Sequence, residues 1–246
     1  MGVTSESGHA KNVSNFDELI SACTSFGATF NPSKATIKLA GLQATATSSK
    51  TAMSSVNASL AALSNATAAR QVAFEPLSKL ITRVLNALKA TDSSVQIDES
   101  AKSIARKIQG TRVSTKLTEE EKKTLTAEGK ESKQISSSQM SFDMRLDNLD
   151  KFIKLLATIP AYAPNEVDLK VATLTTLYND LKAKNQACVT AYTQLSSARI
   201  VRNDVLYKAN TGVVDSALDV KTYVKSVYGA SAPQYKQISK LAFKMR

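Results

Sequence analysis

Residues 35–70 read ATIKLAGLQATATSSKTAMSSVNASLAALSNATAAR. Apolar or small residues recur there at alternating steps of four and three, at Ala35, Leu39, Leu42, Ala46, Ser49, Met53, Val56, Leu60 and Leu63. Such steps form a heptad seam, in which one face of an α-helix packs against another helix. We therefore predict one helix of about 40 residues, which would be roughly 60 Å long.

The same pattern occurs a second time. The second seam runs through Val167, Val171, Leu174, Tyr178, Leu181, Asn185, Cys188, Tyr192 and Leu195. Flanking segments align as well: NFDELISACTSFG (15–27) with NLDKFIKLLATIP (148–160), FNPSKATIKLAGL (30–42) with YAPNEVDLKVATL (162–174), and LSNATAAR (63–70) with LSSARIVR (195–202). An internal repeat of this kind predicts a duplicated structural unit.

Capping and breaking residues divide each repeat into four helices. A short helix is expected to begin at Asn15, a good N-cap, and a long one at Asn31-Pro32. The long helix should stop at Glu75-Pro76 in the first repeat and at Asn210-Thr211-Gly212 in the second. Two shorter helices are expected to complete each repeat, over 77–90 and 102–112 and over 213–228 and 236–246.

These patterns predict an all-α fold. We expect an elongated helical bundle of two tandem-duplicated four-helix units, with the long helices antiparallel. The expected organisation is an N-terminal arm (1–13), a first unit (14–112), a charged and partly helical connector (113–147) and a second unit (148–246). The 8 glycines and 5 prolines in 246 residues leave little room for the turns of an all-β fold.

Composition indicates a cytoplasmic protein. Cys23 and Cys188 have no neighbouring cysteine or histidine and read as buried apolar residues in a reducing compartment. The first residues, MGVTSESGHAKNV, lack the apolar core of a secretory signal. No run of 18 strongly apolar residues occurs, so we predict no transmembrane helix.

Residues that could carry catalysis are scarce. His9 is the only histidine and falls in the predicted arm, so we expect no zinc site built from histidine and cysteine ligands. The chain has no GxSxG, P-loop or GxGxxG motif. We expect a non-enzyme without catalytic residues, metal, cofactor or small-molecule substrate.

Basic residues gather at the end of each repeat, and the net charge is +11. The candidate contacts for nucleic acid or another anion are Lys102, Arg106, Lys107, Arg112, Lys236, Lys240, Lys244 and Arg246. Lysine and arginine can neutralise phosphates. They also suit helix C-termini and solubility in general, so both explanations stay open.

The middle of each long helix is uncharged, over 51–69 and 185–198. Small residues there would allow another helix to come close. The candidate helix–helix interface comprises Met53, Val56, Leu60, Leu63, Leu181, Cys188, Tyr192 and Leu195. Two alternatives remain: the two middles pack on each other within one chain, or they form a surface for self-association or for binding a partner.

Four strings carry a family resemblance: FEPLSKLITRVLNALKA (74–90), KSIARKIQGTR (102–112), YNDLKAKN (178–185) and PQYKQISKL (233–241). They resemble an uncharacterised family of bacterial all-helical proteins of about this length. The resemblance implies a bacterial origin, and it implies no activity or functional residue.

Three functional hypotheses follow. The first is a non-catalytic structural or assembly protein that self-associates as a homo-oligomer or filament. The alternative is a nucleic-acid-binding protein that uses the basic ends of the two units. A weaker alternative is a helical protein that interacts with anionic membranes.

Overall fold

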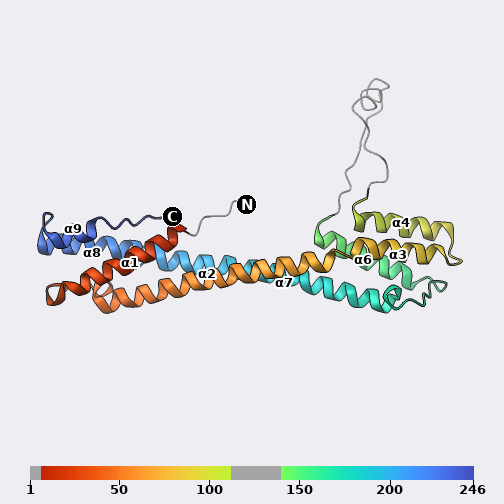
Figure 1. The fold of residues 1–246 in the computed structure, drawn as a ribbon, viewed down its shortest axis with the longest axis horizontal. Coiled ribbons are helices and arrows are strands. Elements are labelled where there is room, and N and C mark those ends of the chain that lie inside the picture. Colours follow the sequence, from red (N-terminus) through yellow and green to blue (C-terminus); the bar gives the residue numbers. More distant parts are fainter. Residues whose placement is uncertain (1–6, 112–139) are drawn as a thin grey trace, which may run out of the picture. The chain divides into compact units, whose positions relative to one another are not determined.

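The computed structural model describes residues 7–111 and 140–246, and the regular structure within these ranges is helical throughout (Figure 1). The prediction of an all-α fold is therefore confirmed for the described part of the chain. Its elements, with 3₁₀ turns labelled η, are α1 Ser7–Ser25, η1 Gly27–Thr29, η2 Ala35–Ile37, α2 Leu39–Phe74, α3 Leu77–Lys89, α4 Val95–Gln109, α6 Phe142–Ala157, η3 Val167–Leu169, α7 Val171–Tyr207, α8 Val213–Tyr228 and α9 Pro233–Ser239.

Two compact units make up the structure, and both long helices contribute to each of them. Unit 1 comprises Met1–Ser64 and Thr190–Arg246, and unit 2 comprises Asn65–Val189. Each compact unit thus combines half of one predicted repeat with half of the other. The units predicted at 14–112 and 148–246 are instead continuous stretches of sequence, one for each repeat. The physical reason is helix length: 36 residues of α2 extend about 54 Å, so its two ends meet different elements.

The core of unit 1 is built by α1, the start of α2, the end of α7, and α8 with α9. Its fully buried side chains include Phe16, Leu19, Leu42, Leu206 and Val220. A smaller cluster of Val56, Leu195 and Ala198 joins α2 to α7 in the same unit.

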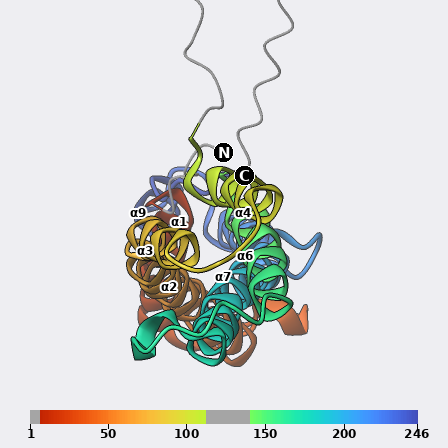
Figure 2. The same cartoon turned by 90° about the vertical axis from the view of Figure 1, so that its right-hand side faces the viewer.

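The core of unit 2 lies among α3, α4, α6, the end of α2 and the start of α7, which Figure 2 views from the side of α3 and α4. Phe74, Leu149 and Phe152 are fully or almost fully buried in it. Thr67 of α2 contacts Cys188 of α7, and three residues later in α2, Arg70 contacts Asn185, which lies three residues earlier in α7. The two long helices are therefore antiparallel within this unit, as predicted.

The long helices begin later than predicted. They start at Leu39 and Val171 and contain 36 and 37 residues. The expected start at Asn31-Pro32 is wrong because η2 precedes α2, and the residue between them, Lys38, is extended with ψ 153°. The seam positions Ala35 and Val167 consequently lie exposed in the 3₁₀ turns, while Ile37 and Leu169 are buried instead.

Helix α1 begins earlier than predicted, at Ser7 rather than Asn15. Of the arm predicted at 1–13, residues 1–6 lie outside the described ranges, and the rest forms two turns of helix. His9, Asn12 and Val13 are buried there. Tertiary contacts explain the difference, because the side chains of Asn12 and Asn15 bond to the backbone of residues 242–244.

The predicted helix breaks agree better with the structure. α2 ends at Phe74 and α3 begins at Leu77, on either side of Glu75-Pro76. α7 ends at Tyr207, and the turn before α8 places Asn210 at a positive φ of 66°. Of the connector predicted at 113–147, residues 113–139 lie outside the described ranges, and 142–147 belong to α6.

Each unit contains an ion pair between a short helix and a 3₁₀ segment, with reversed charges. In unit 2, Arg83 of α3 pairs with Asp168 of η3, whereas in unit 1, Asp219 of α8 pairs with Lys34 beside η2. Arg83 and Asp219 occupy corresponding positions in α3 and α8, six residues after each helix begins at Leu77 and Val213. If a repeat packed on itself in the same register, Arg83 would face Thr36 and find no carboxylate, and Asp219 would face the like-charged Glu166. The charges therefore favour the observed combination of halves.

Reversing one charge of the unit 2 pair tests this idea. We expect Arg83→Asp to lower the free energy of unfolding by about 1 kcal/mol, because an exposed ion pair is worth at most about that much and repulsion from Asp168 replaces it. The double variant Arg83→Asp/Asp168→Arg should recover most of the loss in urea unfolding. Lys79→Asp, the same charge change at an exposed position of α3, is the control. Equal losses at positions 79 and 83, with no recovery, would contradict the expectation.

Candidate functional site

The basic residues predicted as anion contacts lie on different kinds of structure in the two units. In unit 2, Lys102, Arg106 and Lys107 lie on α4, the last two within its final turn. Lys102 Nζ is 4.0 Å from Glu99 Oε1. Arg112 lies outside the described residues. The favourable interaction of Arg106 and Lys107 with the helix C-terminus already accounts for their position.

In unit 1, the corresponding residues are not on one helix. Lys236 belongs to α9, which ends at Ser239, and Lys240, Lys244 and Arg246 follow it on the segment 240–246. All four are exposed. The two basic groups therefore differ in local structure, although their sequences align.

The predicted interface residues lie on both long helices. In unit 1, Val56 and Leu195 are buried with Ala198, Leu60 and Leu63 pack against them, and Met53 packs against the larger core. In unit 2, Leu181 is fully buried and Cys188 is 4% exposed. Cys188 Sγ lies 3.8 Å from Thr67 Oγ1 on α2. Contacts within each unit thus account for these seven residues.

Tyr192 differs from the prediction. Its side chain is 52% exposed, and Ala191 takes the buried position on α7. The buried seam there runs Cys188, Ala191, Leu195, Ala198, in steps of three and four that continue one helical face. Alanine lets α2 and α7 approach, whereas a tyrosine ring in the same place would hold them apart.

A buried polar cluster in unit 1 was not predicted. His9 Nδ1 lies 2.7 Å from the hydroxyl of Tyr207, and the two rings lie 5.7 Å apart between centroids. Asn12 Nδ2 donates to the Lys244 carbonyl at 2.8 Å and lies 3.4 Å from the Tyr207 hydroxyl. Asn15 Nδ2 donates to the Ala242 carbonyl at 2.7 Å. These side chains hold the segment 241–246 against α1.

One signal in the sequence pointed to this cluster. Asn15 and Asn148 are identical in the aligned repeats, and Asn15 is predicted to be a helix N-cap. Both are instead buried inside helices, and Asn148 Nδ2 donates to the Met144 carbonyl at 2.8 Å. Asn12, Asn15 and Leu19 lie three and four residues apart, which places them on one face of a helix. This spacing is as consistent with buried amides inside a helix as with an N-cap at Asn15.

Unit 2 contains a second polar network, between α2, α6 and α7. Arg70 donates to Asn185 Oδ1 at 2.9 Å, and Asn185 Nδ2 donates to Asp143 Oδ1 at 2.7 Å. The Arg70 guanidinium also lies 4.0 Å from the centroid of the Phe142 ring. The amide of Asn185 thus links a cation to a carboxylate through hydrogen bonds.

Arg145 of α6 holds two backbone carbonyls in the same unit. Its Nε donates to the Ile108 carbonyl at 3.2 Å, and its terminal nitrogen to the Phe74 carbonyl at 3.4 Å. Burial lowers the pKa of Arg145 below its ordinary value. Its role is to join the ends of α2 and α4 to α6, a packing role.

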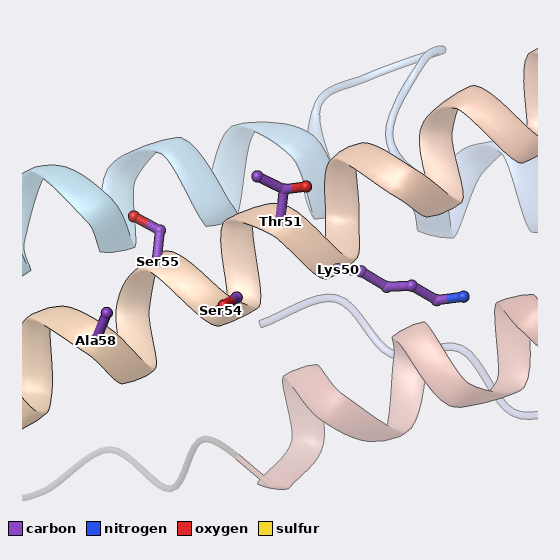
Figure 3. A pocket seen from close by; sticks show the side chains of 5 residues that line it. All are labelled: Lys50, Thr51, Ser54, Ser55 and Ala58. Atoms are coloured by element: carbon purple, nitrogen blue, oxygen red, sulfur yellow. The ribbon is translucent and has the colours of Figure 1, made fainter.

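Surface hollows occur among the described residues. One of about 510 Å³ lies along α2 and is lined by Lys50, Thr51, Ser54, Ser55 and Ala58 (Figure 3). Lys50 reaches Asp17 of α1 at 2.8 Å, so its charge is already paired. No convergent set of polar groups marks this hollow as a ligand site.

A second hollow of about 590 Å³ lies in unit 2, between the end of α3 and residues 161–166. Tyr162 lines it, and its hydroxyl donates to the Leu169 carbonyl at 2.7 Å. Burial raises the pKa of Tyr162 to about 12, and the carboxylates of Asp168 and Glu166 add to the rise.

This shift predicts a pH-dependent contribution of Tyr162 to stability. The folded state favours the neutral phenol of Tyr162. The contribution of this phenol to the free energy of unfolding is therefore complete below the unfolded-state pKa of about 10, and it is lost as the pH rises towards 12. Tyr162→Phe should cost about 1 kcal/mol at pH 7 through the lost hydrogen bond. The difference between wild type and variant in urea unfolding should shrink between pH 9.5 and 11.5. A difference that stays constant over this range would contradict the assignment.

Metal and thiol chemistry find little support in the described residues. Over residues 7–111 and 140–246, no three His, Cys, Asp or Glu side chains gather as a metal site. Burial raises the pKa of the Cys23 thiol to about 12, which keeps it protonated and unreactive at neutral pH. Among the helices that the structure describes, none combines the length and apolar character needed to cross a membrane.

Comparison with protein-family models, with curated proteins and with solved structures gives no match.

Proposed function

We propose that this chain is a non-catalytic structural protein that assembles with copies of itself. The observation that supports the proposal is the exposure of large apolar side chains on α7, where Ile200 is 68% exposed and Val201 is 57% exposed. Both follow the uncharged stretch 185–198. Burying one such side chain on association would contribute about 1.5–3 kcal/mol.

The arrangement of the elements supports the same proposal. The order short helix, 3₁₀ turn, long helix and two shorter helices occurs twice along the described chain, as α1 to α4 and as α6 to α9. We propose that this order reflects a duplicated building block, with each compact unit completed by half of each repeat. Buried Asn12, Asn15 and Asn185 use their amides to join neighbouring elements, which favours a structural role over an enzymatic one.

Light scattering across protein concentration and salt tests the assembly. We expect an average mass above that of the 26.4 kDa chain, rising with concentration. Ile200→Lys should reduce this mass, because a charge on the surface would have to be desolvated on association. Val95→Lys is the matched control, since Val95 is 73% exposed on α4. A monomer at every concentration and salt would exclude self-assembly.

Nucleic-acid binding is the second candidate, supported by the net charge of +11 and by exposed Lys107, Lys236 and Lys240. Binding should weaken steeply with salt if these residues neutralise phosphates. A gel-shift assay with single- and double-stranded DNA would test it. Binding that is unchanged after neutralising Lys102, Arg106, Lys107, Lys236 and Lys240 would reject this site.

Interaction with anionic membranes is a weaker candidate that rests on the same charge. Co-sedimentation with phosphatidylserine vesicles would reveal it. A cytoplasmic location in a bacterium remains part of the proposal, based on the sequence.

A further inference from the structure

Residues 241–246 form an extended segment that α1 holds through hydrogen bonds to its backbone. Asn12 makes a paired contact: its Nδ2 donates to the Lys244 carbonyl at 2.8 Å, and its Oδ1 accepts from the Lys244 N–H at 3.1 Å. One turn later on α1, Asn15 Nδ2 donates to the Ala242 carbonyl at 2.7 Å. At the other end, the Arg246 guanidinium lies over Gly8, where a Cβ would be only 2.0 Å from its Cζ.

Helix α8 holds the same segment through Lys221. Its Nζ donates to the Leu241 carbonyl of the segment and, at 3.3 Å, to the carbonyl of Ser239, the last residue of α9. The ammonium also lies 5.4 Å from the centroid of the Phe243 ring. Burial lowers the pKa of Lys221, as expected for an amine enclosed between a helix and the segment.

Side chains of the segment alternate between two environments, as in a β-strand. Leu241 is 8% exposed, and both Leu241 and Phe243 pack against the core of unit 1. The Ala242 and Lys244 carbonyls meet the asparagines of α1. We call this surface, made by Asn12, Asn15, Lys221 and the adjoining core, the segment groove. It binds the backbone through the side chains of Asn12, Asn15 and Lys221, and its apolar part takes two apolar side chains of the segment.

The contacts of Asn12, Asn15 and Lys221 with residues 241–244 do not depend on the covalent link between the segment and α9. One bond does cross this link: the Leu241 N–H donates to the carbonyl of Ile238 in α9 at 3.2 Å, and Lys240 between them is exposed. The same six residues of a neighbouring chain would meet the same donors, acceptors and apolar surface. Exchange would then conserve the contacts of Asn12, Asn15 and Lys221 with the segment, and would change the connection at Lys240 together with the bond from Leu241 to Ile238.

We propose that the segment groove is an assembly site that takes residues 241–246 of a second copy of this chain. Each chain has one segment and one groove at different places, so every exchanged contact is head-to-tail and can continue into an open chain or close into a ring. The proposal rests on the self-association proposed above, because a tethered segment competes at an effective concentration of about millimolar. Copies held together by another surface overcome this competition.

Two full-length variants test the exchange by complementation. The groove variant, Asn12→Leu/Asn15→Leu, keeps its segment, and the segment variant, Leu241→Ala/Phe243→Ala, keeps its groove. We expect each variant alone to reach only the mass set by the other association surface in light scattering, while an equimolar mixture also forms 1:1 dimers through the one intact segment–groove pair. Far-ultraviolet circular dichroism checks that each is folded. If the groove variant is not folded, Lys221→Met replaces it.

A labelled peptide of sequence KLAFKMR (240–246) provides a test that needs no self-association. The peptide should bind the segment variant and should bind the groove variant about tenfold or more weakly in fluorescence anisotropy. Absence of binding to the segment variant at millimolar peptide would overturn the exchange.

The outcomes separate the two proposals. If both variants assemble like wild type, or if mixing restores no dimer, the exchange is rejected while self-assembly stands. If wild type is monomeric but the peptide still binds the segment variant, self-assembly is rejected, and with it the exchange between copies, leaving a groove that only closes its own chain.

Discussion

Phe16→Ala is expected to lower the free energy of unfolding by about 3–5 kcal/mol, the largest effect of any substitution considered for this chain. Phe16 is fully buried in the core of unit 1, where α1 meets α8 and the start of α2. Truncation to alanine removes most of a large apolar side chain from that core and leaves a cavity. The surrounding helices can close the cavity only in part, so both the transfer and the cavity costs apply.

Urea unfolding followed by circular dichroism measures this change. Leu218→Ala is the control in the same unit, because Leu218 is 49% exposed on α8 and should change stability by no more than about 0.5 kcal/mol. A loss below about 1 kcal/mol for Phe16→Ala would mean that α1 does not pack in the core.

The second large effect is expected for Asn185→Met, which should cost about 2–3 kcal/mol. Methionine is the residue at the aligned position Met53 of the first repeat, so the substitution preserves the repeat pattern and removes only the amide. Arg70 would lose its acceptor at 2.9 Å, and Asp143 its donor at 2.7 Å. Arg70 Nε is already buried without a hydrogen-bond partner, so the guanidinium would lose solvation that it cannot regain inside the unit.

Asn179→Met on the exposed face of the same helix is the control, and should change stability little. Equal urea midpoints for Asn185→Met and wild type would show that the network between α2, α6 and α7 contributes nothing to stability. Recovery in the double variant Asn185→Met/Arg70→Met would confirm that the cost comes from the unpaired cation, because the buried charge is then absent.

Much of the secondary structure could be predicted, because heptad spacing and helix-breaking residues within a few turns of one another determine it. The heptad steps identified both long helices, and Glu75-Pro76 and Asn210-Thr211-Gly212 marked where they end. The starts were less predictable. Asn15 resembles an N-cap in isolation, yet it lies in the third turn of α1, because its amide bonds to a segment 227 residues away.

The candidate surfaces show the same limit. A heptad pattern cannot distinguish Ala191 from Tyr192 as the buried residue, since both lie near the seam and the choice depends on how close α2 approaches. The basic residues at 236–246 align with those at 102–112. One group lies on a helix and the other continues into an extended segment, because Asn12, Asn15 and Lys221 hold that backbone in place.

By itself, the sequence determined that this protein is helical, where its long helices break and which faces of them are apolar, because these depend on residues within a few turns of one another. Only the tertiary structure decided which halves pack together and what the buried polar residues hold. Asn12 and Lys244 are 232 residues apart, and His9 and Tyr207 are 198 apart. Such pairings come from antiparallel packing of long helices, which brings the first residues of the described chain beside the last.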